Sequence, residues 1–155
     1  MRDYSKAVEW YRKAVAQGDA EAQNSLGYCY EKGYGVGRDY GRAVEWYSKA
    51  AAQGNARGQC SLGNCYADGH GVEQDYGKAV EWYRKAAEQG DASGQCYLGD
   101  CYFEGHGVEC DYGKAVEWYS KAAEQGNEIG KLSLMFIKNL PIPLILRLIK
   151  LIRVC

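Results

Sequence analysis

The chain has 155 residues, of which 46% are apolar or aromatic, and its formal net charge at neutral pH is −1. This composition suits a globular protein of about one domain and excludes collagen, a disordered chain and a helical membrane protein. Residues 1–128 hold 14 basic and 20 acidic side chains, whereas residues 129–155 hold five basic and no acidic ones. An acidic main region argues against nucleic acid as a partner, because such binding depends on neutralising phosphates. The N-terminal residues contain no apolar signal segment, which favours an intracellular protein.

A repeat of 36 residues organises the sequence. The segments DYSKAVEWYRKA, DYGRAVEWYSKA, DYGKAVEWYRKA and DYGKAVEWYSKA begin at Asp3, Asp39, Asp75 and Asp111. Residues 39–74 and 75–110 agree at 26 of 36 positions, which indicates tandem duplication of one unit. We expect a repeat array over residues 1–128, a basic apolar tail over residues 141–155, and the repeats 3–38, 39–74, 75–110 and a degenerate 111–140.

The first half of each repeat is predicted to form an amphipathic helix. In the first repeat its apolar residues recur at the spacing of one helix face: Tyr4, Ala7, Val8, Tyr11, Ala14 and Val15. Gly18 suits the left-handed residue that ends such a helix. The residue after this glycine, which is Asp19, Asn55, Asp91 or Asn127 in successive repeats, is expected to cap the second helix.

The second helix of each repeat contains a glycine in its middle, at Gly27, Gly63 and Gly99. A glycine there costs about 1 kcal/mol relative to alanine, so its recurrence predicts that helix backbones approach closely. A Gly-x-Gly-Val turn follows, and the sequence shows no strand pattern. The predicted fold class is all-α, a right-handed α-solenoid of helical hairpins in which the first helices line the concave side.

These motifs resemble those of a known family. The run AVEWYRKAAEQGDA, followed by LGxCY, GxGV and DY at a 36-residue period, is similar to the Sel-1-like repeat (SLR) family, which is related to the tetratricopeptide repeats. The resemblance covers residues 3–128 and implies a curved helical scaffold whose concave face holds other proteins. Members of this family assemble membrane-associated complexes, act in signalling and protein quality control, or mediate contact with a host.

Cysteine-rich members of the SLR family join their two helices by disulfides, and some are linked to β-lactam binding or hydrolysis. In this chain the positions of the first helices that would hold the partner cysteines are alanine: Ala51, Ala87 and Ala123. Cys60 and Cys65 lie five residues apart on one helix, which separates their Cα atoms by roughly 8.7 Å, beyond the disulfide limit of about 7 Å. We therefore expect reduced thiols.

No metal site, cofactor or catalytic group is predicted. Cys29, Cys65 and Cys101 are expected to be small core residues. The set Cys60, Cys65 and His70 recurs one repeat later, but it lacks the short cysteine spacing of structural zinc sites. His70 and His106 flank turn glycines, which indicates exposed turn residues or part of a binding edge. The chain is not expected to be an enzyme, because no arrangement of nucleophile and base is recognisable.

The repeat pattern decays after Glu128. Met135 stands where the packing glycine is expected, but Leu134 keeps the pattern and predicts a helix near residues 129–138. Pro141 and Pro143 interrupt the chain, and the final segment LILRLIKLIRVC places its basic residues on one side of an apolar stretch.

Three interpretations of residues 141–155 remain open. In the first, the tail is a helix that caps the solenoid. In the second, it is a cationic amphipathic helix in weak contact with an anionic membrane surface. In the third, it did not evolve with the repeat and results, for instance, from a shifted reading frame or a truncation. A membrane span is not expected, because a helix of about 18 Å falls short of a hydrocarbon core of about 30 Å. The array begins at Met1 without a cap, so a fragment of a longer protein is also compatible with the sequence.

A stripe of cationic and tryptophan side chains borders the apolar face of the first helices, and we call it the Lys/Arg–Trp stripe. Its members are Lys6, Trp10, Lys13, Arg42, Trp46, Lys49, Lys78, Trp82, Lys85, Lys114, Trp118 and Lys121. On a concave surface these tryptophans are suited to anchor a peptide with aromatic or acidic groups. In the alternative interpretation the indoles pack between neighbouring repeats and the lysines pair with glutamates on their own helix.

The predicted function is a non-catalytic scaffold that binds a protein or peptide partner on the concave face of the solenoid. One alternative is a membrane-surface adaptor that residues 141–155 hold on anionic lipid. A further alternative, which the family resemblance implies, is a protein that binds or hydrolyses β-lactams. The sequence does not identify the partner or the pathway.

Overall fold

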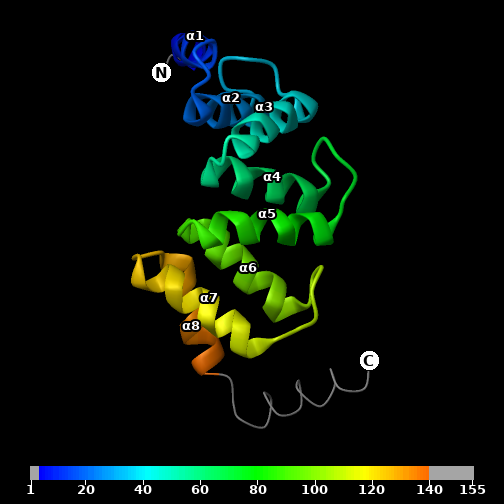
Figure 1. Cartoon of the computed structure of the whole chain (residues 1–155), viewed down its shortest axis with the longest axis vertical. Helices are drawn as coiled ribbons and strands as arrows, with labels where there is room; N and C mark the ends of the chain where they lie inside the picture. Colours follow the sequence, from blue (N-terminus) through cyan, green and yellow to red (C-terminus); the bar gives the residue numbers. More distant parts are fainter. Residues whose placement is uncertain (1–3, 140–155) are drawn as a thin grey trace.

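The computed structural model describes residues 4–139, and this part of the chain folds into eight α-helices without a strand. The helices are α1 (Tyr4–Val15), α2 (Ala20–Lys32), α3 (Tyr40–Ala52), α4 (Ala56–Asp68), α5 (Tyr76–Glu88), α6 (Ala92–Glu104), α7 (Tyr112–Glu124) and α8 (Glu128–Lys138). They stack one after another along the long axis of the molecule, with α1 at one end and α8 at the other (Figure 1). The predicted all-α solenoid of helical hairpins is confirmed.

The four predicted N-caps are also confirmed. Asp19, Asn55, Asp91 and Asn127 each accept a hydrogen bond from the backbone N–H three residues later, at 2.7–3.0 Å. The aspartates at the start of the repeated DY segment do the same for the odd-numbered helices from α3 onward, at 3.0 Å. Both helices of the unit therefore begin at a residue fixed by the repeat.

A glycine in each even-numbered helix lies against a buried tyrosine of the following odd-numbered helix. A Cβ atom at Gly63 would lie 2.6 Å from ring atoms of Tyr83. Gly27 meets Tyr47 and Gly99 meets Tyr119 in the same way, at 2.7 and 2.8 Å. The close helix approach that the mid-helix glycines predict is thus present, and the tyrosines are at most 3% exposed.

The core follows the stack as three apolar clusters. Each cluster joins alanine and tyrosine side chains of an odd-numbered helix to apolar side chains of the neighbouring even-numbered helices. Cys29, Cys65 and Cys101 are buried in these clusters, as the sequence predicts. Three buried glutamines lie beside the core, and each accepts a hydrogen bond from a glutamine at the end of the next odd-numbered helix: Gln53 to Gln23, Gln89 to Gln59 and Gln125 to Gln95.

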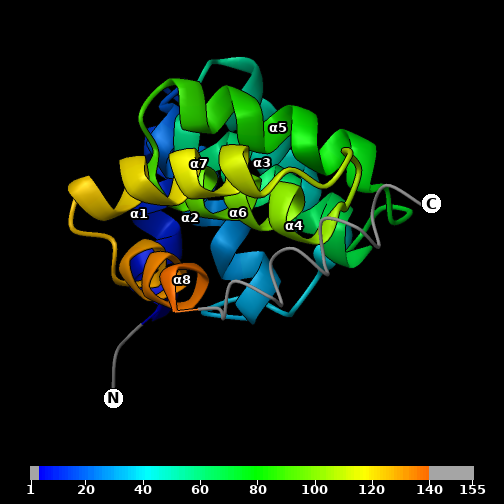
Figure 2. The same ribbon diagram turned by 90° about the horizontal axis from the view of Figure 1, so that it is seen from below.

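The odd- and even-numbered helices form two layers. Seen along the stack, α3, α5 and α7 lie on one side and α2, α4 and α6 on the other (Figure 2). In the even layer α4 contacts both α2 and α6. Arg57 of α4 also forms a 2.7 Å ion pair with Glu21 of α2, and the Ser61 hydroxyl bonds to Asn24 at 3.2 Å. Neighbouring repeats therefore approach each other most closely in the even layer, and a stack bends toward its closer side.

This arrangement differs from the expectation that the first helices, α1, α3, α5 and α7, line the concave side. The physical reason lies in the bulk of the two layers. Tryptophans of the odd-numbered helices fill the space between neighbouring repeats, whereas small polar side chains such as Asn24 and Ser61 meet between even-numbered helices. The 36-residue period fixes the alternation of the helices but not the side toward which the stack bends.

Helix α8 confirms the helix expected near residues 129–138 and packs on α7. Leu134 and Ile137 are buried, whereas Ile129, Leu132, Met135 and Phe136 are 58–62% exposed. The tail of residues 141–155, with its three interpretations, lies outside the described residues.

Replacing Gly63 with alanine tests the glycine–tyrosine contact. The added Cβ has no room beside the buried Tyr83 ring, so we expect Gly63→Ala to lower the free energy of unfolding by about 2 kcal/mol, the usual cost of overpacking. Urea denaturation followed by circular dichroism measures this change. Gly41→Ala is the matched control, because a Cβ at this exposed helical position meets its nearest atom at 3.4 Å. Equal stability of the two variants would contradict the prediction.

Candidate functional site

A groove runs along the even-numbered helices. Hollows of about 480, 260, 310 and 330 Å³ follow one another from α2 to α8. Each hollow is lined by side chains of at least two even-numbered helices, from α2 and α4 at one end to α6 and α8 at the other. We call this face of the molecule the groove.

The two most similar repeats differ mainly where they face the groove. Residues 39–74 and 75–110 differ at ten positions, and five of these share one exposed face of the even-numbered helix. We call these positions the groove stripe. It consists of Arg57, Ser61, Asn64, Ala67 and Asp68 on α4, and of Ser93, Tyr97, Asp100, Phe103 and Glu104 on α6. All of these side chains line the hollows.

Exposure alone does not explain this divergence. On α3 and α5 the exposed Glu45 and Lys49 recur unchanged one repeat later, whereas three positions differ: Arg42 and Lys78, Ser48 and Arg84, and Ala52 and Glu88. Five of the ten substitutions thus lie on the groove side of the unit, against three on α3 and α5. The groove stripe is not among the residues predicted from the sequence, although a comparison of what changes between the repeats contains the signal.

The hydroxyls of two buried tyrosines, on α5 and α7, reach the groove. The hydroxyl of Tyr83 donates to Asn64 Oδ1 at 2.7 Å, and that of Tyr119 donates to Asp100 Oδ1 at 2.6 Å. Tyr47 instead donates to Glu31 at 2.7 Å, because the position that corresponds to Asn64 is Tyr28 in the first repeat. Burial raises the pKa of the Asp100 carboxyl, an effect that the Tyr119 hydrogen bond opposes and the charge of Glu104 increases.

The charge of the groove changes along the stack. Near α2 and α4 the cation Arg57 is paired with Glu21, and the neighbouring side chains are serine and asparagine. The two hollows on α6 are lined by the carboxylates Asp68, Asp100 and Glu104, and by no lysine or arginine of the described residues. The α6 end of the groove is therefore acidic.

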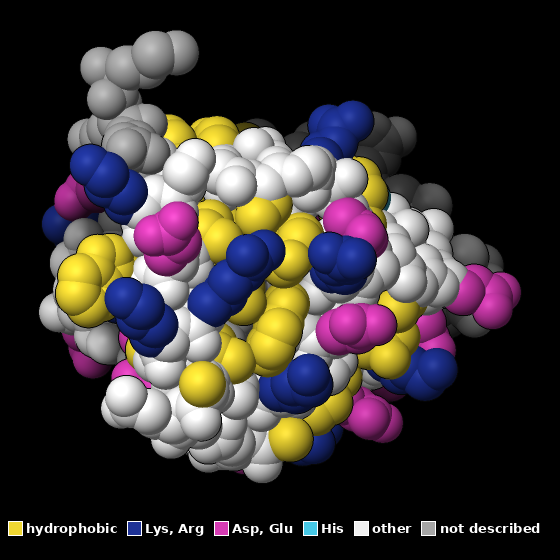
Figure 3. All heavy atoms as spheres, turned by 90° about the horizontal axis from the view of Figure 1, so that it is seen from above, with side chains coloured by type: hydrophobic (Ala, Val, Ile, Leu, Met, Phe, Trp, Pro, Cys, Tyr) yellow, Lys and Arg dark blue, Asp and Glu magenta, His cyan; other side chains and the backbone are white. Residues whose placement is uncertain are grey.

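The Lys/Arg–Trp stripe lies on the odd-numbered helices. Trp46, Trp82 and Trp118 are half-buried and pack against apolar clusters that include the preceding even-numbered helix. Trp10 is 69% exposed, because no helix precedes α1 in the part of the chain that the structure describes. Figure 3 views this end of the stack and shows apolar side chains exposed in the middle of the face, with lysine and arginine among them.

The cations of the stripe lie over aromatic rings of the chain itself. The ammonium groups of Lys13, Lys49, Lys85 and Lys121 lie 4.0–4.8 Å from the ring centroid of the tryptophan one turn earlier. Arg42, Lys78 and Lys114 lie over Tyr30, Tyr66 and Tyr102 of the preceding even-numbered helix, at 5.2–5.5 Å. Lys6 is exposed on α1. The stripe thus forms one row of cation–π contacts, and its role toward a partner stays a prediction.

The two histidines stack on tyrosines in the turns between helices. His70 lies on Tyr40 and His106 on Tyr76, each with ring centroids 4.5 Å apart. Both imidazoles are exposed, and His106 Nδ1 lies 2.9 Å from a Glu104 carboxylate oxygen. The turn histidines are therefore exposed, and His106 lines one of the acidic hollows.

The thiols offer little nucleophilic chemistry. Of the six cysteines within residues 4–139, all are free and five are buried. Burial raises the pKa of Cys65 and Cys101 to about 12, which keeps these thiols protonated at neutral pH. Residues 4–139 bring together no group of three or more potential metal ligands. No helix of this region is both long and apolar enough to cross a membrane.

The Sel1 repeat family model matches residues 1–19, 20–55, 56–91 and 92–127. The last three matches begin where α2, α4 and α6 begin. The family's repeat therefore pairs each even-numbered helix with the odd-numbered helix that follows it, and this pair contains the glycine–tyrosine contact.

Several solved structures are similar to this chain. A Sel1 repeat protein of Oxalobacter formigenes is 38% identical with a TM-score of 0.83, over 88% of this chain and 54% of that one. The protective antigen c5321 of uropathogenic Escherichia coli, which has an SLR fold, is 37% identical with a TM-score of 0.55, over 87% and 37%. Cysteine rich protein B of Helicobacter pylori is 28% identical with a TM-score of 0.66, over 83% and 92%.

The chain thus spans 54% and 37% of the first two of these structures. No curated protein sequence matches it significantly. The family match and the shared fold agree with the repeat unit seen in the helices, and the chain belongs to the Sel1 repeat (SLR) family, whose members are generally non-catalytic scaffolds that bind other proteins.

Proposed function

We propose that this chain is a scaffold that binds a segment of a partner protein along the groove of α2, α4, α6 and α8. The observation that carries the proposal is the divergence of the groove stripe between repeats that are otherwise almost identical. Five of the ten substitutions between these repeats fall on this one face, and every one of them changes a side chain that lines a hollow. A row of hollows with different linings suits a ligand whose successive side chains differ.

Asp100 supports this proposal. Asn64 accepts the same tyrosine hydrogen bond one repeat earlier, so the bond does not require a carboxylate. A partly buried carboxylate is less favourable for folding than an amide of the same shape. Its presence in the groove is therefore better explained by a ligand than by stability.

The Lys/Arg–Trp stripe is the alternative binding surface. Its tryptophans have packing contacts within the chain, and Trp10 offers the most exposed indole. The membrane-surface role of residues 141–155 and the β-lactam role stay predictions.

Exchanging the groove stripe of α6 for that of α4 tests the proposed surface. The variant carries Ser93→Arg, Tyr97→Ser, Asp100→Asn, Phe103→Ala and Glu104→Asp, all of which are side chains that the preceding repeat already accommodates. We expect affinity capture with mass spectrometry to lose the partner that the parent protein retains, because the hollows on α6 change while the fully buried core residues of this helix stay the same. Circular dichroism checks the helical content of the variant.

The matched control replaces Trp10, Trp46, Trp82 and Trp118 with phenylalanine. This variant removes the indoles, keeps most of the packing volume and leaves the groove stripe intact, so we expect it to retain the partner. Loss of the partner from the folded tryptophan variant, with retention by the groove variant, would move the binding site to the Lys/Arg–Trp stripe.

Asp100→Asn tests the stability cost of the groove carboxylate. Because the pKa of Asp100 is raised in the folded state, its favourable contribution is complete at low pH and is lost as pH rises through the folded pKa. We expect Asp100→Asn to unfold at higher urea concentration than the parent above neutral pH, and the difference to shrink below about pH 4, the ordinary pKa of aspartic acid. The exposed Asp68→Asn serves as the control. A difference that does not depend on pH would contradict the prediction.

A further inference from the structure

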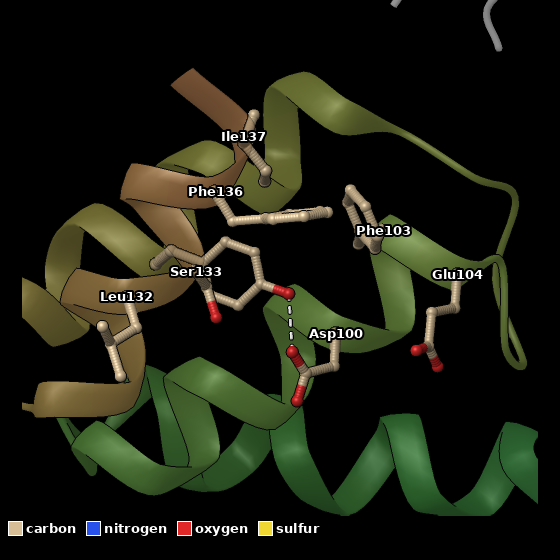
Figure 4. Close-up of a pocket in the computed structure, with 8 residues that line it drawn as sticks. Asp100, Phe103, Glu104, Leu132, Ser133, Phe136 and Ile137 are labelled. Atoms are coloured by element: carbon tan, nitrogen blue, oxygen red, sulfur yellow. Dashed lines mark hydrogen bonds between the residues drawn. The ribbon is translucent and has the colours of Figure 1, made fainter. Parts of the chain in front are cut away.

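The end of the groove between α6 and α8 differs from the rest in chemistry. Its hollow of about 330 Å³ is lined by Phe103 of α6 and by Leu132, Phe136 and Ile137 of α8. The rings of Phe103 and Phe136 meet edge to face with centroids 6.3 Å apart, and Figure 4 shows them side by side above Asp100. Leu132 and Phe136 are 62% and 59% exposed, so an apolar surface remains open to solvent there.

Two carboxylates of α6 border this apolar surface. Asp100 and Glu104 lie one helical turn apart and line both this hollow and the neighbouring one of about 310 Å³. Asp100 uses Oδ1 for the Tyr119 hydroxyl, as the dashed line in Figure 4 marks. Neither hollow has a lysine or arginine among its described lining residues, and the basic side chain beside these carboxylates is His106, whose Nδ1 lies 2.9 Å from Glu104.

We infer that the α6–α8 end of the groove binds a basic amphipathic segment of a partner protein. A lysine or arginine of the segment contacts Asp100 and Glu104, and a large apolar side chain next to it packs on Phe103 and Phe136. This inference rests on the proposed function and specifies the chemistry of its partner.

Charge and shape complementarity support this occupant. Arginine and lysine carry a cationic head on an apolar stem, so one such side chain satisfies carboxylates and phenyl rings together. An acidic segment would bring like charges together at Asp100 and Glu104, which is unfavourable. A polar neutral segment would leave Leu132 and Phe136 exposed. The preceding repeat has asparagine and alanine at the positions of Asp100 and Phe103, so these two residues are special to α6, whereas Glu104 has a carboxylate counterpart in Asp68.

Fluorescence anisotropy with a defined probe tests the inference on the full chain. The probe is a fluorescein-labelled peptide LRALLRALLRAL, and its counterpart LEALLEALLEAL carries glutamate in place of arginine. We expect saturable binding of the arginine peptide only. The double variant Asp100→Asn/Glu104→Gln should bind it roughly ten-fold more weakly, as expected for the loss of charge-assisted hydrogen bonds. Phe136→Ser, at an exposed position, should also weaken binding.

Glu81→Gln on α5 is the matched control, because it removes one negative charge from an exposed position outside the groove. Equal binding of the two peptides, or equal affinity of the double variant and the Glu81→Gln control, would overturn the inference. A third variant, Arg147→Glu/Lys150→Glu/Arg153→Glu, addresses the basic tail of the chain itself. Tighter probe binding by this variant would show that the tail is the occupant and would overturn the assignment to a partner.

The experiment separates this inference from the proposed function. If the arginine peptide does not bind but exchange of the α6 groove stripe still abolishes partner capture, the groove is the binding site and only the basic chemistry is wrong. If the exchange also leaves capture unchanged, both proposals fail.

Discussion

The contact between a helix glycine and the ring of a buried tyrosine sets the spacing between the layers of this stack. Because Gly63 has no side chain, the Tyr83 ring lies across α4 and its hydroxyl reaches Asn64 on the groove side. The same geometry carries the Tyr119 hydroxyl to Asp100. A larger residue at the glycine would push the following helix outward and withdraw the hydroxyl. The packing of the repeat and the polar floor of its groove therefore depend on one contact.

This constraint explains which positions the repeats share. The tyrosine, the glycine and the aspartate that caps each odd-numbered helix from α3 onward each meet a fixed partner, and the tryptophans fill the space between neighbouring repeats. The glutamine at the end of each odd-numbered helix from α3 onward is fixed as well, because it bonds to a buried glutamine of the preceding even-numbered helix. Identity at these positions follows from packing. In the groove stripe only the position of Asn64 and Asp100 has a partner in common, the tyrosine hydroxyl, and either side chain can accept that hydrogen bond.

The sequence predicts those parts of the fold that follow from local rules. The N-caps, the buried cysteines and the close approach at Gly27, Gly63 and Gly99 depend on residues within one helical hairpin. The concave side is not predictable in this way, because it depends on the relative bulk of two layers over several repeats. A 36-residue period can also be divided at either helix, and the division that begins with the DY segment separates the even-numbered helix from its glycine–tyrosine partner.

The divergence of the groove stripe makes the two ends of the groove chemically different, although the repeats that build it are similar. At the α2 end Arg57 is neutralised by Glu21 among serine, asparagine and tyrosine side chains, whereas the α6 end presents carboxylates beside phenyl rings. Identical repeats would bind an extended segment equally well in several registers. With different hollows, a segment that carries its basic and apolar residues at one end is held in one register and one orientation. Specificity therefore requires few substitutions, provided that they fall on the face that packing leaves free.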